Sequence, residues 1–276
     1  MYQKAQEANN VRGLIGAKQC LANAYMGTGR WEEGKKALEE AHMLLPKLDN
    51  VIVHNSVLCQ LVSLSKAKDD FENLKKYLDE QKSILEDYIR KNPTMEEAFQ
   101  DPLIFNELYY AYYYLEMNQP HPAFEHLQKG AKYLTPHTYF MYRVLYYDAY
   151  ALYYRRCKEY DKALSQLDST IVLLQEAFSS DYVNQLSAKA DILVEAGRSQ
   201  EALPIYEKVL QMKDSLVTEL SDKQMKLIQS NYHINKIALE EEQLKNKIQL
   251  IVLIVSGRTL IVLYFSCYAS SGYVKP

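Results

Sequence analysis

The sequence predicts an all-α fold built from repeated pairs of short helices. Glycine and proline are sparse, nine and eight in 276 residues, while alanine, leucine, glutamate and lysine, which favour helix, are abundant. The spacing of large, small and turn residues in Ile15–Leu48 also recurs along the chain. A pattern that returns at a fixed period indicates a stack of similar units.

The stretch from Ile15 to Leu48 is the best-formed of these units. It carries, in order, a large residue followed directly by a small one, an aromatic residue one turn later, two small residues a heptad apart and a closing proline. The pattern resembles a tetratricopeptide repeat (TPR), a helix-turn-helix unit of about 34 residues, although Lys18 stands where that family carries an early tryptophan. The residues that carry the resemblance are Leu21, Ala22, Tyr25, Gly34, Ala41 and Pro46.

The same spacing fits four later stretches. The first of these lacks the small residues, and a charged, proline-bearing insertion over 90–101 then interrupts the period. The resemblance implies a right-handed α-solenoid of about five helix-turn-helix repeats, in which each pair buries its apolar stripe against the next pair. Residues 1–14 are expected to contain part of a preceding repeat, because Ala5 occupies the late small position. The predicted repeats are 15–48, 55–88, 104–137, 144–177 and 183–216, within an array over 15–217.

A different pattern begins at residue 218. Residues 218–247 contain no glycine or proline, and their apolar residues follow one heptad seam. Such a seam predicts a long amphipathic linker helix that can pair with a second copy of itself as a coiled coil. The alternative is a helix that caps the last repeat, since a solenoid needs a polar terminal surface. The seam residues are Leu220, Leu227, Ile234, Ile237, Leu244, Ile248 and Ile251.

Residues 248–268 predict a single transmembrane helix, followed by a short tail over 269–276. The run is long enough to cross a bilayer, and its many Ile, Leu and Val residues outweigh the cost of Arg258, roughly 2.5 to 3.5 kcal/mol at a helix centre. The alternative is a β-hairpin around Ser256–Thr259, but an all-α chain offers such a hairpin no sheet to join. The segment is therefore expected to anchor the chain in a membrane.

Composition and motifs argue against catalysis, cofactor binding and direct nucleic-acid binding. A formal net charge of -3 provides no basic field for a phosphate backbone. The four cysteines and six histidines are scattered, without the spacing of a zinc site or a disulfide framework. The sequence contains no glycine-rich phosphate loop, HExxH or GxSxG motif. We therefore expect a non-enzymatic protein without a cofactor or a metal.

Proteins of the TPR family usually bind a peptide or a partner helix on the concave surface of their first helices, and the resemblance implies the same here. The groove-facing positions of the family, carried over repeat by repeat, give a mixed polar and apolar surface without the basic clamp that holds acidic tails. Tyrosines crowd the first helices of the third and fourth repeats, and most are expected to fill gaps between stacked helices. The expected groove residues are Gln19, Asn23, Met26, Cys59, Ser63, Lys66, Leu108, Tyr112, Leu115, Asp148, Leu152, Arg155, Ser187, Asp191 and Val194.

The order of repeats, long helix and single apolar span resembles the membrane-anchored TPR sensor-regulators of bacteria. In that group an extracytoplasmic repeat domain is connected through one span to a cytoplasmic histidine kinase or helix-turn-helix output domain. The resemblance implies that this chain is the sensory or regulatory input part, held at the bacterial inner membrane, with its output domain and export signal missing. The alternative is a soluble cytoplasmic TPR adaptor or peptide-responsive regulator.

Overall fold

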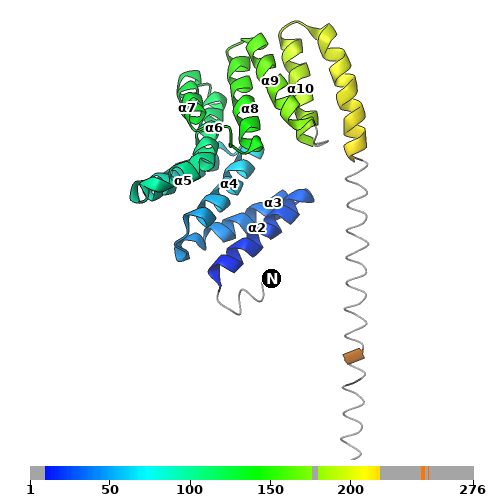
Figure 1. Cartoon of the computed structure of the whole chain (residues 1–276). Helices are drawn as coiled ribbons and strands as arrows, with labels where there is room; N and C mark the ends of the chain where they lie inside the picture. The colour runs from blue at the N-terminus through cyan, green and yellow to red at the C-terminus, as the bar shows by residue number, and fades with distance from the viewer. Residues whose placement is uncertain (1–9, 176–179, 218–243, 246–247, 249–276) are drawn as a thin grey trace, which may run out of the picture. The chain divides into compact units, whose positions relative to one another are not determined.

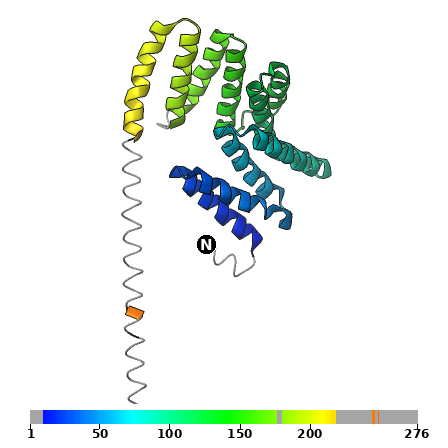
Figure 2. The same cartoon turned by 180° about the vertical axis from the view of Figure 1, so that it is seen from behind.

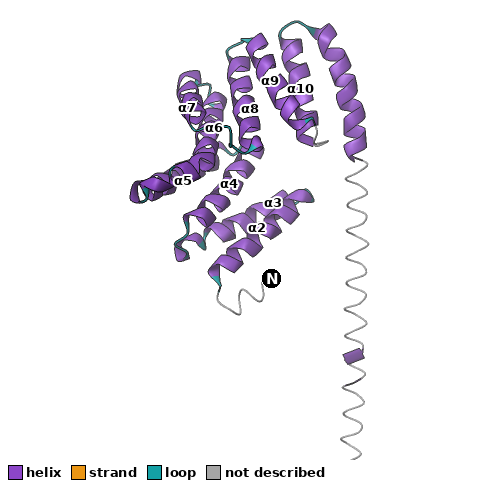
Figure 3. Ribbon diagram, viewed as in Figure 1, coloured by secondary structure: helices purple, strands orange, loops and turns teal. Residues whose placement is uncertain are grey.

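The computed structural model describes residues 10–175, 180–217, 244–245 and 248. The chain divides into two compact units, Met1–Leu216 and Val217–Pro276, and the described residues lie almost entirely in the first. All regular structure within the described residues is helical (Figure 3), which confirms the predicted all-α class. The expectations for a preceding repeat and for the linker helix concern residues that are mostly outside this part of the chain.

The described residues from 11 to 217 form five successive helix hairpins (Figures 1 and 2). The second helix of each hairpin packs against the first helix of the next, so α3 contacts α4, α5 contacts α6, α7 contacts α8 and α9 contacts α10. The hairpins are α2 (Val11–Gly27) with α3 (Trp31–His42), α4 (Val51–Ala67) with α5 (Phe71–Lys91), α6 (Gln100–Glu116) with α7 (Pro120–Lys132), α8 (Phe140–Arg156) with α9 (Tyr160–Leu174), and α10 (Ser180–Glu195) with a helix over 199–217.

One backbone turn is repeated in all five hairpins. Two residues after each first helix ends, the chain adopts a positive φ, between 53° and 77°. The next residue then donates its amide to a carbonyl in the last turn of the first helix, as Arg30 does to Tyr25 at 2.9 Å and Arg198 to Leu193 at 2.7 Å. This arrangement ends a helix and reverses the chain. The residues with positive φ are Gly29, Asp69, Asn118, Lys158 and Gly197.

Small residues let the helices of a hairpin approach closely. A Cβ added to Gly34 of α3 would lie 2.7 Å from Met26 Cγ and 3.3 Å from the carbonyl oxygen of Ala22 in α2. Ala22 itself is fully buried. Leu21, the large residue beside it in the repeat pattern, is 41% exposed.

The predicted insertion over 90–101 is mostly helical. Arg90 lies in the last turn of α5, two short 3-10 turns follow (Pro93–Met95 and Glu97–Phe99), and Asp101 lies in the first turn of α6. Phe99 is buried and packs on Tyr88 with the ring centroids 5.1 Å apart. The charged residues therefore lie on helices or on the short turns between them, and the extra chain length is taken up by a longer α5.

Among the described residues, no helix combines the length and the apolar character needed to span a bilayer. The predicted span over 248–268 lies outside the described residues except for Ile248.

Replacing Lys158 with glycine is expected to stabilise the protein by about 0.5 to 1 kcal/mol, because glycine adopts a positive φ without the Cβ clash of lysine. Lys158 has φ 61° and is exposed, so no packing is lost. The reciprocal change, Gly197→Lys, is the matched control and should destabilise by a similar amount. Thermal unfolding of the full chain followed by circular dichroism measures both, and an unchanged Tm for Lys158→Gly would contradict the expectation.

Candidate functional site

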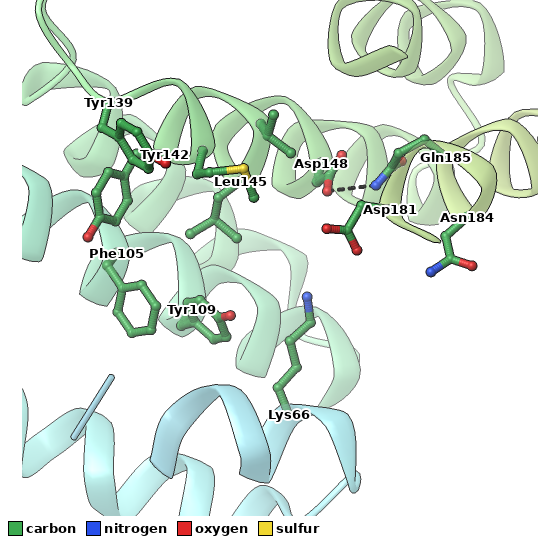
Figure 4. A pocket seen from close by; sticks show the side chains of 12 residues that line it. Lys66, Phe105, Tyr109, Tyr139, Tyr142, Leu145, Asp148, Asp181, Asn184 and Gln185 are labelled. Carbon is green, nitrogen blue, oxygen red and sulfur yellow. Dashed lines mark hydrogen bonds between the residues drawn. The ribbon is translucent and has the colours of Figure 1, made fainter. Parts of the chain in front are cut away.

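One well-defined hollow lies on the first helices. It has a volume of about 470 Å³ and is bounded by α4, α6, α8 and α10, with Tyr139 from the segment before α8 (Figure 4). Four successive repeats thus contribute to one pocket, although they are far apart in the sequence. Its lining residues are Lys66, Phe105, Tyr109, Tyr139, Met141, Tyr142, Val144, Leu145, Asp148, Asp181, Asn184 and Gln185.

One half of the pocket is aromatic. The rings of Phe105 and Tyr109 on α6 lie 4.3 Å apart, and those of Tyr139 and Tyr142 meet edge to face at 6.3 Å. Burial raises the pKa of Tyr109, and it raises the pKa of Tyr142 to about 12. Both hydroxyls therefore stay protonated at neutral pH, and this wall offers apolar rings with neutral hydrogen-bonding groups at their edges.

Lys66 of α4 enters the pocket from the opposite side (Figure 4). Its Nζ lies 4.6 Å from the ring centroid of Tyr112 and 5.5 Å from that of Tyr109, within the range of cation–π attraction. Burial lowers the pKa of the ammonium, and the charges of Asp148 and Glu116 oppose this effect. None of the ion pairs found among the described residues includes Lys66, and its charge lies against the faces of two tyrosines.

Asp148 forms the polar end of the pocket. Its carboxylate accepts hydrogen bonds from Thr170 Oγ1 of α9 at 3.1 Å and from Gln185 Nε2 of α10 at 2.8 Å. Burial is the main cause that raises the pKa of Asp148 to about 6, and the charge of Asp181 adds to it. The two hydrogen bonds and the charge of Lys66 act in the other direction. Near pH 6, this carboxyl therefore exchanges between a neutral and a charged form.

A second, smaller hollow of about 310 Å³ lies between α2 and α4. Trp31 and Met26 give it apolar walls, and Ser63 connects it to the first pocket, because Ser63 Oγ lies 3.3 Å from the hydroxyl of Tyr109. Beside it, Gln60 accepts a hydrogen bond from Gln19 at 2.9 Å and donates one to Asn23 at 3.1 Å. The two hollows together follow the first helices of the five described hairpins.

The residues expected to face the groove separate into three groups. Lys66 and Asp148 line the larger pocket, and Asn23, Met26, Cys59 and Ser63 line the smaller one. Gln19 and Tyr112 contact these pocket residues through the hydrogen bond and the cation–π contact given above. Neither hollow is lined by Leu152, Arg155, Ser187, Asp191 or Val194, and Arg155 forms an ion pair with Glu195.

Two of the expected groove residues were assigned wrongly. Leu108 and Leu115 of α6 are 0% and 2% exposed and belong to the core, where Leu108 lies under Gly130 of α7. In α6, the buried Asn106 donates hydrogen bonds to the Leu78 carbonyl and to Gln81 of α5, so the helix presents a different face from the one that the family spacing assumes. Phe105 and Tyr109 occupy the pocket face instead.

Sequence reasoning also missed residues outside α6. Tyr139 and Tyr142 precede the repeat expected over 144–177, and Asp181, Asn184 and Gln185 lie in the first two turns of α10. The available signal was the density of tyrosines in the first helices. It could not show which rings face the pocket, because these helices carry tyrosine on every face.

The chemistry of the pocket suits binding. Its lining contains no Ser, Cys or His, and no group of three His, Cys, Asp or Glu side chains suitable for a metal ion is found in the described part of the chain. What the pocket offers is an aromatic wall, one ammonium, two carboxylates and two amides. These groups can hold an apolar body with a polar or charged end.

Comparison with known proteins shows similarity of fold. No family model matches the sequence, and no curated protein matches it. BtubC (BKLC) from P. vanneervenii superposes with a TM-score of 0.55 at 12% identity, over 78% of this chain and 85% of that one. The apo form of RapI also gives 0.55 at 12% identity, over 74% and 72%. A thermophilic TPR protein from Thermus thermophilus gives 0.49 at 16% identity, over 75% and 97%. The chain therefore has a TPR-like helical-repeat fold.

The raised pKa of Asp148 predicts a specific pH dependence of stability. Its folded value of about 6 lies above the ordinary value of 3.8, so the folded state holds the proton more tightly. The resulting stabilisation is complete below about pH 4 and is lost as the pH rises through 6. Asparagine does not titrate, so Asp148→Asn should not lose this stabilisation. Between pH 4 and 7, the free energy of unfolding of the variant should rise by about 1 to 2 kcal/mol relative to that of the wild type. Urea unfolding across this pH range measures the difference. If the free energies of unfolding of the two proteins change with pH in the same way, the prediction is wrong.

Proposed function

We propose that this chain is a non-enzymatic scaffold that binds a peptide, or an extended segment of a partner protein, along its first helices. The observation that carries the proposal is the pocket to which α4, α6, α8 and α10 all contribute. A ligand held there contacts several repeats at once, and in a solenoid the contacts with successive repeats add up along an extended binding surface.

The sizes and surfaces of the two hollows fit side chains of an extended peptide. The aromatic wall of Phe105 and Tyr142 can take an apolar side chain, and the amides of Asn184 and Gln185 can bond to a peptide backbone. The smaller hollow beside Trp31 is mostly apolar and can take a second side chain. Peptide recognition commonly combines such pockets with polar contacts that set the register.

Selection from a displayed library of random heptapeptides on the immobilised full chain tests this proposal. Selected peptides should bind the wild type and bind at least about tenfold more weakly to Asn184→Trp. Asn184 is exposed at the pocket, so the indole ring would obstruct the pocket without disturbing the core. Fluorescence anisotropy with labelled peptides measures both affinities.

Gln128→Trp is the matched control, because Gln128 is exposed on α7 and outside both hollows. It should bind the selected peptides as the wild type does. Peptides that bind Asn184→Trp with unchanged affinity, or a selection that yields no binding peptide, would count against the proposed function.

We further propose that the scaffold is the input part of a membrane-anchored bacterial signalling protein. The support is the apolar run over 248–268 after a long amphipathic segment over 218–247, which can provide self-association. The repeats would then bind their ligand outside the cytoplasm, and a change in the repeats would pass along the connecting segment. The runner-up is a soluble cytoplasmic adaptor or peptide-responsive regulator.

Expression of two lengths of the chain separates these alternatives. Under the membrane proposal, residues 1–247 should be recovered in the soluble fraction, while the full chain should sediment with membranes and require detergent. A topology reporter fused after Lys275 should report the side opposite to that of a reporter at Met1. Full chains that remain soluble without detergent, or two reporters on the same side, would favour the adaptor.

A further inference from the structure

The charges of the larger pocket point to the kind of peptide that it accepts. We infer that the pocket binds a basic side chain, arginine or lysine, with the charged end between Asp148 and Asp181 and the aliphatic stem against the aromatic wall. This inference rests on the proposed function and names the chemical class of its ligand.

The first step is that neither carboxylate forms an ion pair within the described part of the chain, although the charge of Lys66 acts on Asp148. The described donors that hydrogen-bond to Asp148, Thr170 and Gln185, are both neutral. Asp181 is exposed in the first turn of α10, and no ion pair found among the described residues includes it or Asp148. The two carboxylates repel each other, and the charge of Asp181 adds to the rise in the pKa of Asp148. A part-buried carboxylate without a counter-ion is costly in the free protein, and an incoming cation removes that cost.

The second step is the position of the cation that the pocket already has. Lys66 lines the same pocket, but its Nζ rests over the rings of Tyr112 and Tyr109. Figure 4 shows it entering from α4, while Asp181 and Gln185 enter from α10. The lining thus carries one positive and two negative charges, and an anionic ligand would meet a net repulsion.

The third step is the fit of the remaining wall. The rings of Phe105, Tyr139 and Tyr142 form a surface that can cover the methylene groups of a basic side chain and attract its charge. A volume of about 470 Å³ leaves room for a long side chain together with part of the peptide backbone. Charge and shape therefore favour the same class of ligand.

The sign of the pH dependence separates this ligand from an acidic one. The groups that face Asp148 are Lys66 from α4, Tyr109 from α6, Thr170 from α9, and Gln185 and Asp181 from α10. Burial raises the pKa of Asp148 itself to about 6. A bound cation needs its charged form, so affinity should rise about tenfold from pH 5 to pH 7. An anion held by Lys66 would show the opposite slope.

The test uses the tightest peptide from the heptapeptide selection whose binding Asn184→Trp weakens. That peptide should contain arginine or lysine, and replacing this residue with citrulline or norleucine should weaken binding at least about tenfold at pH 7. Asp148→Asn should weaken the parent peptide by a similar factor and remove its pH dependence. Asp181→Asn should weaken it less, since that carboxylate is exposed. Asp49→Asn, which changes an exposed aspartate outside the pocket, is the matched control and should leave affinity unchanged.

The outcomes separate a failure of this inference from a failure of the proposed peptide-binding function. A peptide that binds the pocket without a basic residue, or binds more tightly at pH 5 than at pH 7, overturns the inference and leaves the proposed function standing. A selection that gives no pocket-dependent peptide overturns both. Circular dichroism of Asp148→Asn shows whether a loss of binding reflects unfolding, and the peptide analogues test the same charge without altering the protein.

Discussion

Close contact between the two helices of each hairpin is the constraint on which the rest of the structure depends. A Cβ at Gly130 of α7 would lie 3.1 Å from Leu108 Cδ2 of α6. Likewise, a Cβ at Gly34 of α3 would lie too close to atoms of α2. Hairpins closed in this way still have apolar surface to bury, and each buries it against the next hairpin. The first helices therefore follow one another along a single surface, and residues distant in sequence can line one pocket.

The third hairpin departs from a regular repeat because buried amides fix its position. Asn106 of α6 donates to the Leu78 carbonyl and to Gln81 Oε1, both at 3.0 Å, and Gln81 donates to Asn55 at 2.8 Å. Buried amides are costly unless paired, so this network specifies one register between α4, α5 and α6. With Asn106 held against α5, Phe105 and Tyr109 are left for the pocket.

The sequence was informative where local chemistry decides the structure, and less so where two distant elements must meet. Spacing of Ala22, Gly34 and their equivalents predicted helix hairpins, and glycine at two of the five turns reflects a backbone requirement. The assignment of Leu108 and Leu115 failed because a family spacing assumes uniform stacking. The sequence around Asp148 does not predict its hydrogen bonds with Thr170 and Gln185, because those contacts form only when α8, α9 and α10 pack together.

The carboxylate at position 148 does not contribute to stability near neutral pH. Asparagine has nearly the same shape, and its amide, with a reoriented Gln185, could satisfy the contacts to α9 and α10. Burial has already raised the pKa of Asp148 to about 6, which means that the folded protein holds the charged form at a cost near neutral pH. A cost of this kind at a position that faces a pocket is characteristic of functional sites. The same hydrogen bonds that tie α8 to α9 and α10 thus hold a charge toward the ligand surface, so the stack that builds the groove also sets its preference for a cation.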